Sequence, residues 1–366
     1  MKRTGISDLP LHSGKAPPWL FRRMVKLAGG ITEAIILEYG QDEFLRRISD
    51  PYWFQAFGCV LGFDWHSSGV TTTVTGALKE SVNPEVAGIG FAGGKGKLSR
   101  KTPYEILSIG EKFSLSTRQI ERMQYSSRMS AKVDSTAIQD GYQLYHHFFV
   151  FTEKGKWAVI QQGMNPEKRY ARRYHWLSEN VQSFVEEPHT GIACDSKEKE
   201  VLDMTSRKSS EARKISVDVL NDTKDFSKLF SGQSVLVDFL GSKPRILSMP
   251  KTHLILNMGK RDLETLNRAR EIQPENYEEF LSIQGIGPKT VRSLALISEV
   301  IYGKPPSWED PVKFSFAHGG KDRIPYPVDR KTYDKSIEIL RTGIEQARLG
   351  QREKLSAIKR LGEFYG

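Results

Sequence analysis

Residues 282–296 read "SIQGIGPKTVRSLAL", which places glycine, an apolar residue, glycine, proline and lysine between two runs with helical spacing of apolar residues. Gly285 and Gly287 allow the backbone to turn sharply and to approach a phosphate without a Cβ in the way. Pro288 suits the first helical position, and the free N–H groups at a helix start bind anions. The pattern predicts two helices joined by a tight turn over residues 276–303. We expect DNA contacts from Gly285, Ile286, Gly287, Pro288, Lys289 and Thr290.

This stretch resembles the hairpin of the helix-hairpin-helix DNA glycosylase superfamily, of the endonuclease III type. In bifunctional members the lysine two places after the second glycine is the nucleophile, and Lys289 holds that place. The superfamily also has an aspartate at the head of the next helix. Asp329 fits, within a segment (327–345) whose proline-valine-aspartate start is similar to archaeal 8-oxoguanine glycosylases. Asp310, in "SWEDPV", lies closer to the expected spacing and is the rival.

The resemblance implies a DNA repair enzyme, a bifunctional DNA glycosylase and AP lyase without a cofactor, acting on duplex DNA that carries a lesion. Desolvation frees a lysine amine for attack on C1′ of the sugar, and a Schiff base and β-elimination follow. The aspartate would stabilise the cationic sugar as the base leaves. Two features depart from the endonuclease III type, namely the long interval between Lys289 and Asp329 and the absence of the cluster-binding cysteines. The whole chain also resembles an uncharacterised family of archaea and thermophilic bacteria, the domain of unknown function 763, which implies no activity.

Composition agrees with a nucleic-acid partner. The chain has 366 residues and a formal net charge of +10, a balance that favours a polyanion. Its two cysteines, Cys59 and Cys194, exclude a disulfide framework, a four-cysteine zinc site and a four-cysteine iron–sulfur cluster. Such cysteine usage fits a reducing cytosol, so a cytoplasmic location is expected. The sequence contains neither a signal-peptide pattern nor an apolar run long enough to span a membrane.

The pattern of elements changes near residue 193. Residues 1–192 predict an α+β domain, and residues 193–366 predict an all-α domain of the glycosylase type. In the first domain we expect two short helices broken at Gly29–Gly30 and a strand hairpin over 142–164, followed by a helix that starts at Asn165. In the second, helices are expected on both sides of an irregular insertion at 304–328.

Two further basic stretches are candidates for DNA contact. "EKRYARRYHW" (167–176) alternates cations with aromatic residues, a pattern that suits phosphate contact and base stacking, although its aromatic face on a helix could equally be core. The glycine-rich stretch at 88–101 lacks the spacing of a Walker motif and predicts a basic loop. The cations proposed to touch DNA are Lys168, Arg169, Arg172, Arg173, Lys95 and Lys97.

Two alternatives to the glycosylase remain open. Asp134, Asp140 and Glu153 are candidates for the Mg²⁺ ligands of a structure-specific nuclease. The other alternative is a DNA-binding protein without catalysis. No metal ligands are assigned to the histidines, because neighbours on a strand, such as His146 and His147, point to opposite faces.

Overall fold

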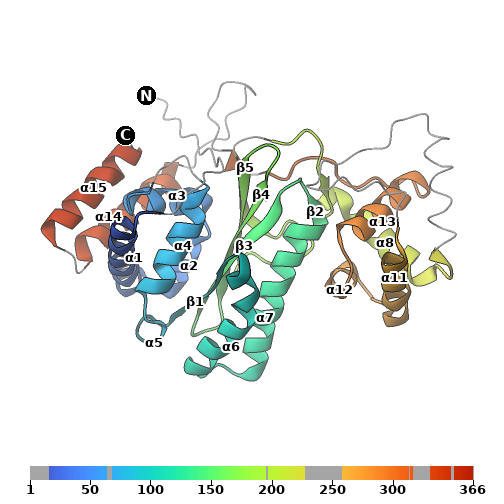
Figure 1. Cartoon of the computed structure of the whole chain (residues 1–366), viewed down its shortest axis with the longest axis horizontal. Coiled ribbons are helices and arrows are strands. Elements are labelled where there is room, and N and C mark those ends of the chain that lie inside the picture. The colour runs from blue at the N-terminus through green and yellow to red at the C-terminus, as the bar shows by residue number, and fades with distance from the viewer. Residues whose placement is uncertain are drawn as a thin grey trace.

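A six-stranded sheet forms the middle layer of the protein in its computed structural model, with helices on both faces (Figure 1). The structure describes residues 16–63, 68–194, 197–226, 258–312, 314–315, 330–347 and 350–365. The strands, in spatial order, are β1 (Ile89–Lys95), β3 (Gln143–Thr152), β4 (Trp157–Asn165), β5 (Tyr170–Leu177), β6 (His189–Cys194) and β8 (Phe314–Ser315). Neighbouring strands are antiparallel except β6 and β8, which are parallel. The predicted hairpin is confirmed as β3 and β4. A separate pair consists of β2 (Ile138–Gln139) and β7 (Leu202–Asp203).

The period-2 alternation of β3 divides its apolar residues between two cores. Phe148 and Val150 pack with one layer of helices, whereas Phe149 and Phe151 pack with the other. Because both faces of the sheet are covered, β3 and β4 carry buried apolar residues on both faces. The fold is therefore mixed α/β around a largely antiparallel sheet.

The first helical layer combines both ends of the described chain. It contains α1 (Pro18–Tyr39), α2 (Gln41–Ile48), α3 (Pro51–Val60), α4 (Gly69–Ser81), α14 (Arg330–Gln346) and α15 (Gln351–Tyr365), with the short α5 (Pro84–Ala87) beside it. Ile339 and Leu340 of α14 are buried in the same core as Met24 and Ile31 of α1. The carbonyl of Val60 in α3 accepts a hydrogen bond of 2.8 Å from Nε of Arg360 in α15.

The second layer carries the turn singled out from the sequence. It contains η1 (Gly96–Lys101), α6 (Thr102–Lys112), α7 (Thr117–Lys132), the single π-helical turn η2 (Val133–Ala137), η3 (Arg207–Ser209), α8 (Ser210–Asp222), α11 (Lys260–Ile272), α12 (Tyr277–Ser282) and α13 (Pro288–Val300). The helices predicted around the turn are confirmed as α11, α12 and α13. The prediction that residues 193–366 are all-α is wrong, because this part of the chain also contributes β7, which pairs with β2, and β8, which pairs with β6.

The predicted break at Gly29–Gly30 is wrong, because α1 runs through it without interruption. A Cβ added to Gly29 would lie 3.1 Å from both Cβ and the carbonyl oxygen of Ser81. The glycine therefore permits close packing of α1 against α4, and the hydrogen bonds of the helix and its buried face outweigh the low helix propensity of two glycines.

The predicted helix from Asn165 is also wrong, because residues 170–177 form β5. The side chain of Asn165 accepts hydrogen bonds of 3.1 Å from the amides of Glu167 and Lys168, so it caps a turn between β4 and β5. Arg169 has a φ of +60°, which a helix does not allow.

The packing does not separate the chain at residue 193. One core joins α1 to α14, and the other joins β3 and β4 to α13. The division into two domains, residues 1–192 and 193–366, therefore stays a prediction from the sequence.

Candidate functional site

The turn between α12 and α13 has the geometry that the sequence indicates. Gly285 has a φ of +97°, and a Cβ at this position would lie 2.9 Å from Cγ2 of Thr265. Pro288 is the first residue of α13, and Gly287 precedes it. No described residue accepts a hydrogen bond from the backbone amides of Gly287, Lys289 or Thr290. The start of α13 therefore offers donors to an anion.

Lys289 forms an ion pair with a carboxylate that the sequence did not suggest. Its Nζ lies 2.8 Å from Oδ2 of Asp262 in α11, and the two side chains are 22% and 33% exposed. The same oxygen accepts a hydrogen bond of 2.9 Å from the amide of Gly259. The expected partner, Asp329, lies outside the described residues.

Two polar residues attach the turn to the sheet layer. Lys132, the last residue of α7, donates a hydrogen bond to the carbonyl of Ile286. Nε2 of Gln139 donates to the carbonyl of Pro288 at 2.7 Å, and its Oε1 accepts from Nε of Arg292 at 2.8 Å. Burial lowers the pKa of Lys132, which is the direction that an amine nucleophile requires. The side chains of Ile286 and Thr290 are buried, so only their backbone groups remain for DNA contact.

Asp310, the alternative candidate for the carboxylate partner of Lys289, forms an ion pair with Arg172 instead. Its carboxylate lies 2.7 Å from NH2 of Arg172 and accepts a hydrogen bond from the amide of Glu198. Arg172 lies 3.0 Å from Asp140 as well, and its side chain is fully buried. The prediction that Arg172 contacts DNA is therefore wrong, because both of its carboxylate partners would be left buried without a counter-charge.

Arg173 is buried on the other face of β5. It donates to Oε1 of Gln55 at 3.1 Å and to Nε2 of His175 at 2.8 Å, and it lies 4.6 Å from the ring centroid of Phe54. Burial lowers its pKa to about 9. Contact with DNA was predicted for Arg173 as well, and its zero exposure contradicts this.

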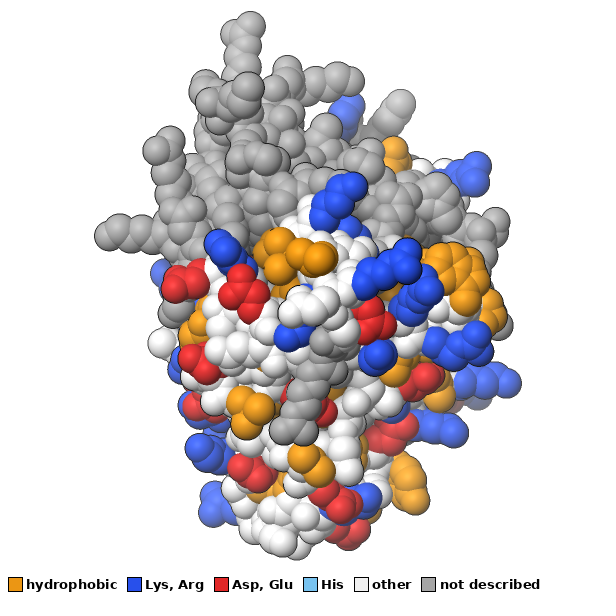
Figure 2. Space-filling model, turned by 90° about the vertical axis from the view of Figure 1, so that its left-hand side faces the viewer, with side chains coloured by type: hydrophobic (Ala, Val, Ile, Leu, Met, Phe, Trp, Pro, Cys, Tyr) orange, Lys and Arg blue, Asp and Glu red, His pale blue; other side chains and the backbone are white. Residues whose placement is uncertain are grey.

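The other predicted cations lie at the surface. Lys168 pairs with Glu198, and Arg169 is an exposed residue of the turn before β5. Lys95 and Lys97 are exposed near the start of η1, where Nζ of Lys95 lies 5.8 Å from the ring centroid of Tyr145. On the face that Figure 2 shows, basic and acidic side chains alternate over the described residues, so positive charge is not concentrated there.

The carboxylates proposed for a nuclease are not brought together. Asp134 accepts a hydrogen bond of 3.0 Å from Nε1 of Trp176. Asp140 forms an ion pair with Arg172 and accepts a hydrogen bond from the hydroxyl of Tyr174. Glu153 lies in the turn that ends β3, where it accepts from Gln41. The described residues hold no group of three or more metal-ligating side chains.

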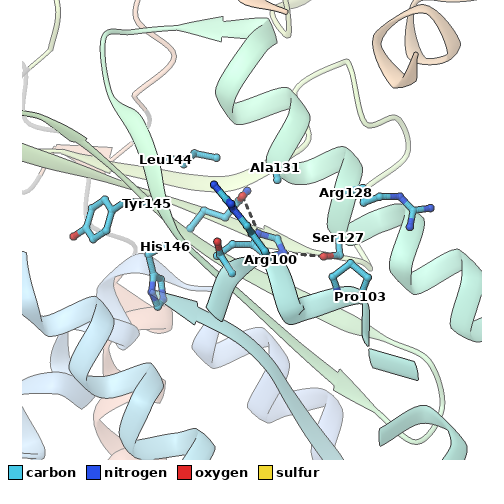
Figure 3. Close-up of a pocket in the computed structure, with 11 residues that line it drawn as sticks. Arg100, Pro103, Ser127, Arg128, Ala131, Leu144, Tyr145 and His146 are labelled. Carbon is cyan, nitrogen blue, oxygen red and sulfur yellow. Dashed lines mark hydrogen bonds between the residues drawn. The ribbon is translucent and has the colours of Figure 1, made fainter. Parts of the chain in front are cut away.

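A pocket between η1, α7 and β3 was not recognised in the sequence (Figure 3). Its volume is about 270 Å³, and its lining includes Arg100, Arg128, Ser127 and His147 but no carboxylate. Figure 3 shows Arg100 crossing the centre of the pocket, whereas Arg128 and Tyr145 point outward at its rim. His146 and His147 of β3 both line this pocket, but the ring of His147 contacts Ser127 of α7, while the ring of His146 reaches Thr75 of α4, as the alternation of a strand predicts.

A chain of hydrogen bonds begins at the pocket wall. Oγ of Ser127 lies 2.8 Å from Nε2 of His147, and Nδ1 of His147 lies 2.9 Å from Oε1 of Gln161. Nε2 of Gln161 donates to Oδ2 of Asp134 at 2.6 Å. All four side chains are at most 6% exposed. The four residues come from α7, β3, β4 and η2, so no local sequence signal joined them.

Comparison with known proteins gives a family but no activity. The family model described as "Protein of unknown function (DUF763)" matches residues 5–328, a match that ends before α14. No curated protein and no solved structure matches the chain. Within the described ranges, no helix has the length and apolar character needed to cross a membrane.

Proposed function

The chain belongs to the family of proteins of unknown function DUF763, and we propose that it is a DNA-processing enzyme that binds duplex DNA at the α12–α13 turn. We further propose that it acts there as a DNA glycosylase and AP lyase with Lys289 as the amine nucleophile. The observation that carries the proposal is the position of Lys289 in the first turn of α13, half-buried and 2.8 Å from a carboxylate. The helix start and the amine would thus meet the same phosphate and sugar.

The phosphate site has the required components. The amides of Gly287, Lys289 and Thr290 and the partial positive charge of the helix start favour an anion. A net charge of +10 supports association with a polyanion. The hydrogen bonds from Lys132 and Gln139 hold the turn against α7 and β2, so a bound strand would meet a fixed surface.

The chemistry requires an amine and a carboxylate at the sugar. When DNA binds, a phosphate displaces Asp262 from Lys289, the ammonium gives its proton to water, and the free amine attacks C1′ of a flipped nucleotide as the base leaves with the C1′–N bonding electrons. Asp262 then lies beside the cationic sugar that forms as the base leaves. Asp329, which the sequence suggests as the carboxylate partner of Lys289, is proposed as a second carboxylate at the sugar.

Borohydride trapping tests the proposal. The protein is incubated in EDTA with a duplex that contains an abasic site, uracil or 8-oxoguanine, and borohydride then reduces any Schiff base to a stable protein–DNA adduct. We expect an adduct in the wild type and none in Lys289→Arg, which keeps the positive charge but cannot form the Schiff base. Lys260→Ala, an exposed lysine at the start of α11, is the matched control and should retain the adduct.

Three results would contradict parts of this proposal. Binding of the duplex without any adduct in the wild type would leave a DNA-binding protein in which Lys289 contacts phosphate. An adduct that survives Lys289→Arg and disappears in Lys132→Arg would move the nucleophile to α7. Cleavage that needs Mg²⁺ and is insensitive to both substitutions would favour a nuclease.

A further inference from the structure

We propose that Ser127 and His147 are the nucleophile and the general base of a second catalytic site, which cleaves phosphodiesters in the pocket between η1, α7 and β3. This inference goes beyond the lyase and does not depend on it. It rests on the hydrogen-bond chain of the pocket wall and on the charge of the pocket lining.

The chain of hydrogen bonds assigns the proton positions. A carboxylate only accepts hydrogen bonds, so the group of Gln161 that faces Asp134 is its NH₂. The oxygen of Gln161 therefore faces His147 and requires a hydrogen on Nδ1 of the imidazole. Nε2 then carries the lone pair, and it faces the hydroxyl of Ser127 at 2.8 Å. A serine beside a base that a third group orients is the arrangement of an activated nucleophile.

The environment keeps the imidazole in its basic form. Burial lowers the pKa of His147, although the hydrogen bond to Gln161 and the charge of Asp134 act in the opposite direction. His147 is thus neutral at neutral pH and ready to take a proton. Asp134 itself is held by Trp176 and His189, so the far end of the chain is fixed.

The lining points to an anionic substrate. Arg100 crosses the pocket and Arg128 lies at its rim, and no carboxylate stands among the described residues that line it. The exposed Lys95, over the ring of Tyr145, adds a further cation at the rim. Guanidinium groups bind phosphate oxygens in a bidentate manner and would stabilise the charge that develops on a phosphorus centre.

The position of the pocket connects it to nucleic acid. Ser127, Arg128 and Lys132 all lie on α7, and Lys132 contacts the α12–α13 turn. Arg128 and Lys132 are four residues apart and share one face of that helix. At 1.5 Å per residue the five residues from Ser127 to Lys132 span roughly 7.5 Å along the axis. A strand held at the turn would pass close to the pocket.

The reaction balances without a metal or a redox partner. Oγ of Ser127 attacks phosphorus, the Oγ–P bond forms, and the hydroxyl proton moves to Nε2 of His147. The P–O bond to the leaving group breaks, the leaving oxygen keeps the electron pair, and it takes the proton from His147. A water molecule then attacks the phosphoserine ester and gives a proton to His147. The Oγ–P bond breaks, and Oγ of Ser127 recovers that proton.

The test uses the full chain in EDTA with bis-p-nitrophenyl phosphate as the probe, followed by an oligonucleotide labelled at both ends, so that the adduct carries a label whichever ester oxygen leaves. We expect release of p-nitrophenolate by the wild type and a loss of at least about 10³-fold in Ser127→Ala. A labelled protein–DNA adduct should form without borohydride in the wild type and in Lys289→Arg, but not in Ser127→Ala. Because the lyase adduct needs borohydride and Lys289, failure of one proposal leaves the other distinguishable.

Matched variants separate chemistry from folding. Ser126→Ala removes an equally buried hydroxyl next in the helix, which donates to the carbonyl of Arg122, and should retain activity. Arg100→Ala removes an exposed side chain and should raise KM for the phosphodiester about 10-fold or more, whereas its neighbour Lys101→Ala should not. Equal losses in Ser126→Ala and Ser127→Ala would overturn the proposal. So would no turnover by the wild type, or turnover of p-nitrophenyl acetate alone.

Discussion

The turn at Lys289 contacts α7 at Lys132, five positions after Ser127 of the pocket, yet the two sites hold their reactive groups in different ways. Among the described residues Lys289 forms an ion pair with Asp262 and is partly exposed. A ligand can therefore replace Asp262 without rearrangement of the surrounding structure. Ser127 is buried and belongs to a chain of four neutral and charged groups, whose orientation is fixed before any substrate arrives. A surface ion pair contributes little to stability and opens easily, whereas a buried polar network is rigid and costly to disturb. The first arrangement suits recognition of a mobile strand, and the second suits a preorganised reaction.

The largest effect is expected from His147→Gln. Glutamine can still hydrogen-bond to Ser127 but cannot take its proton, so release of p-nitrophenolate should fall at least about 10³-fold while borohydride trapping stays unchanged. The control is His146→Gln, which alters a second histidine of the pocket lining whose ring contacts Thr75 and not Ser127. If both variants lose activity to the same extent, His147 has a structural role only.

The next effect concerns the backbone of the turn. Gly285→Ala places a Cβ at a φ of +97° and against Thr265, which should reduce the free energy of unfolding by about 1–3 kcal/mol and weaken duplex binding. Gly287→Ala is the control for stability only, because its φ of −128° is ordinary and the nearest atom to an added Cβ is 3.9 Å away. Chemical denaturation and fluorescence anisotropy with a labelled duplex measure the two effects. Equal stability of both variants would contradict the strain assigned to Gly285.

A pH-dependent effect on stability is expected from the sheet histidines. Burial lowers the pKa of His146 to about 3, with His147 and Lys95 adding to the shift. A lowered folded-state pKa gives stability that is present above the unfolded value of about 6.5 and is lost as the pH falls below it. Between pH 6.5 and 5.5, His146 alone should remove about 1.4 kcal/mol of unfolding free energy per pH unit at most. Urea titrations of the wild type and His146→Gln over this range should differ by that slope, and parallel curves would refute it.

The pH dependence of cleavage should follow from the pKa of His147, which is lowered as that of His146 is. Because burial lowers the pKa of His147, cleavage should stay level from pH 8 to about 6.5 and decline only in more acidic buffer. The titratable and charged groups near His147 are Arg100 of η1 and Arg128 of α7 in the pocket lining, its neighbour His146 and, through Gln161, Asp134 of η2. A profile that already declines above pH 7 would show that a different group limits the reaction.

The smallest effect is expected from Asp262→Asn. Asparagine can still accept from the amide of Gly259 but no longer neutralises Lys289, so stability should change by less than about 1 kcal/mol. Affinity for duplex DNA should rise by a factor of about 2–3, since the lysine no longer needs to leave a carboxylate. Anisotropy titrations at two salt concentrations measure this change. A lower affinity in the variant would show that Asp262 positions Lys289 for DNA.

The sequence predicted elements whose signals are local. Proline and glycine punctuation located α13 and the turn before it, and aromatic runs around "EKGK" located β3 and β4. Prediction from the sequence failed where contacts between residues far apart in the chain determine the structure. Arg172 looked like the polar face of a helix, but Asp140 and Asp310 neutralise it inside the sheet. The partner of Lys289 came from α11, and the chain from Ser127 to Asp134 depends on a strand register that no local pattern specifies.

The return of α14 and α15 to the first helical layer ties the order of synthesis to the order of folding. The core around Met24 and Ile31 is completed by Ile339, Leu340 and Ile344, which emerge from the ribosome long after α1. Gly343 permits this closure, because a Cβ there would lie 3.1 Å from Ile35. Until then α1 exposes an apolar stripe to water and to other nascent chains. A chaperone that covers α1 during translation would be most needed by chains that stall or terminate before residue 330.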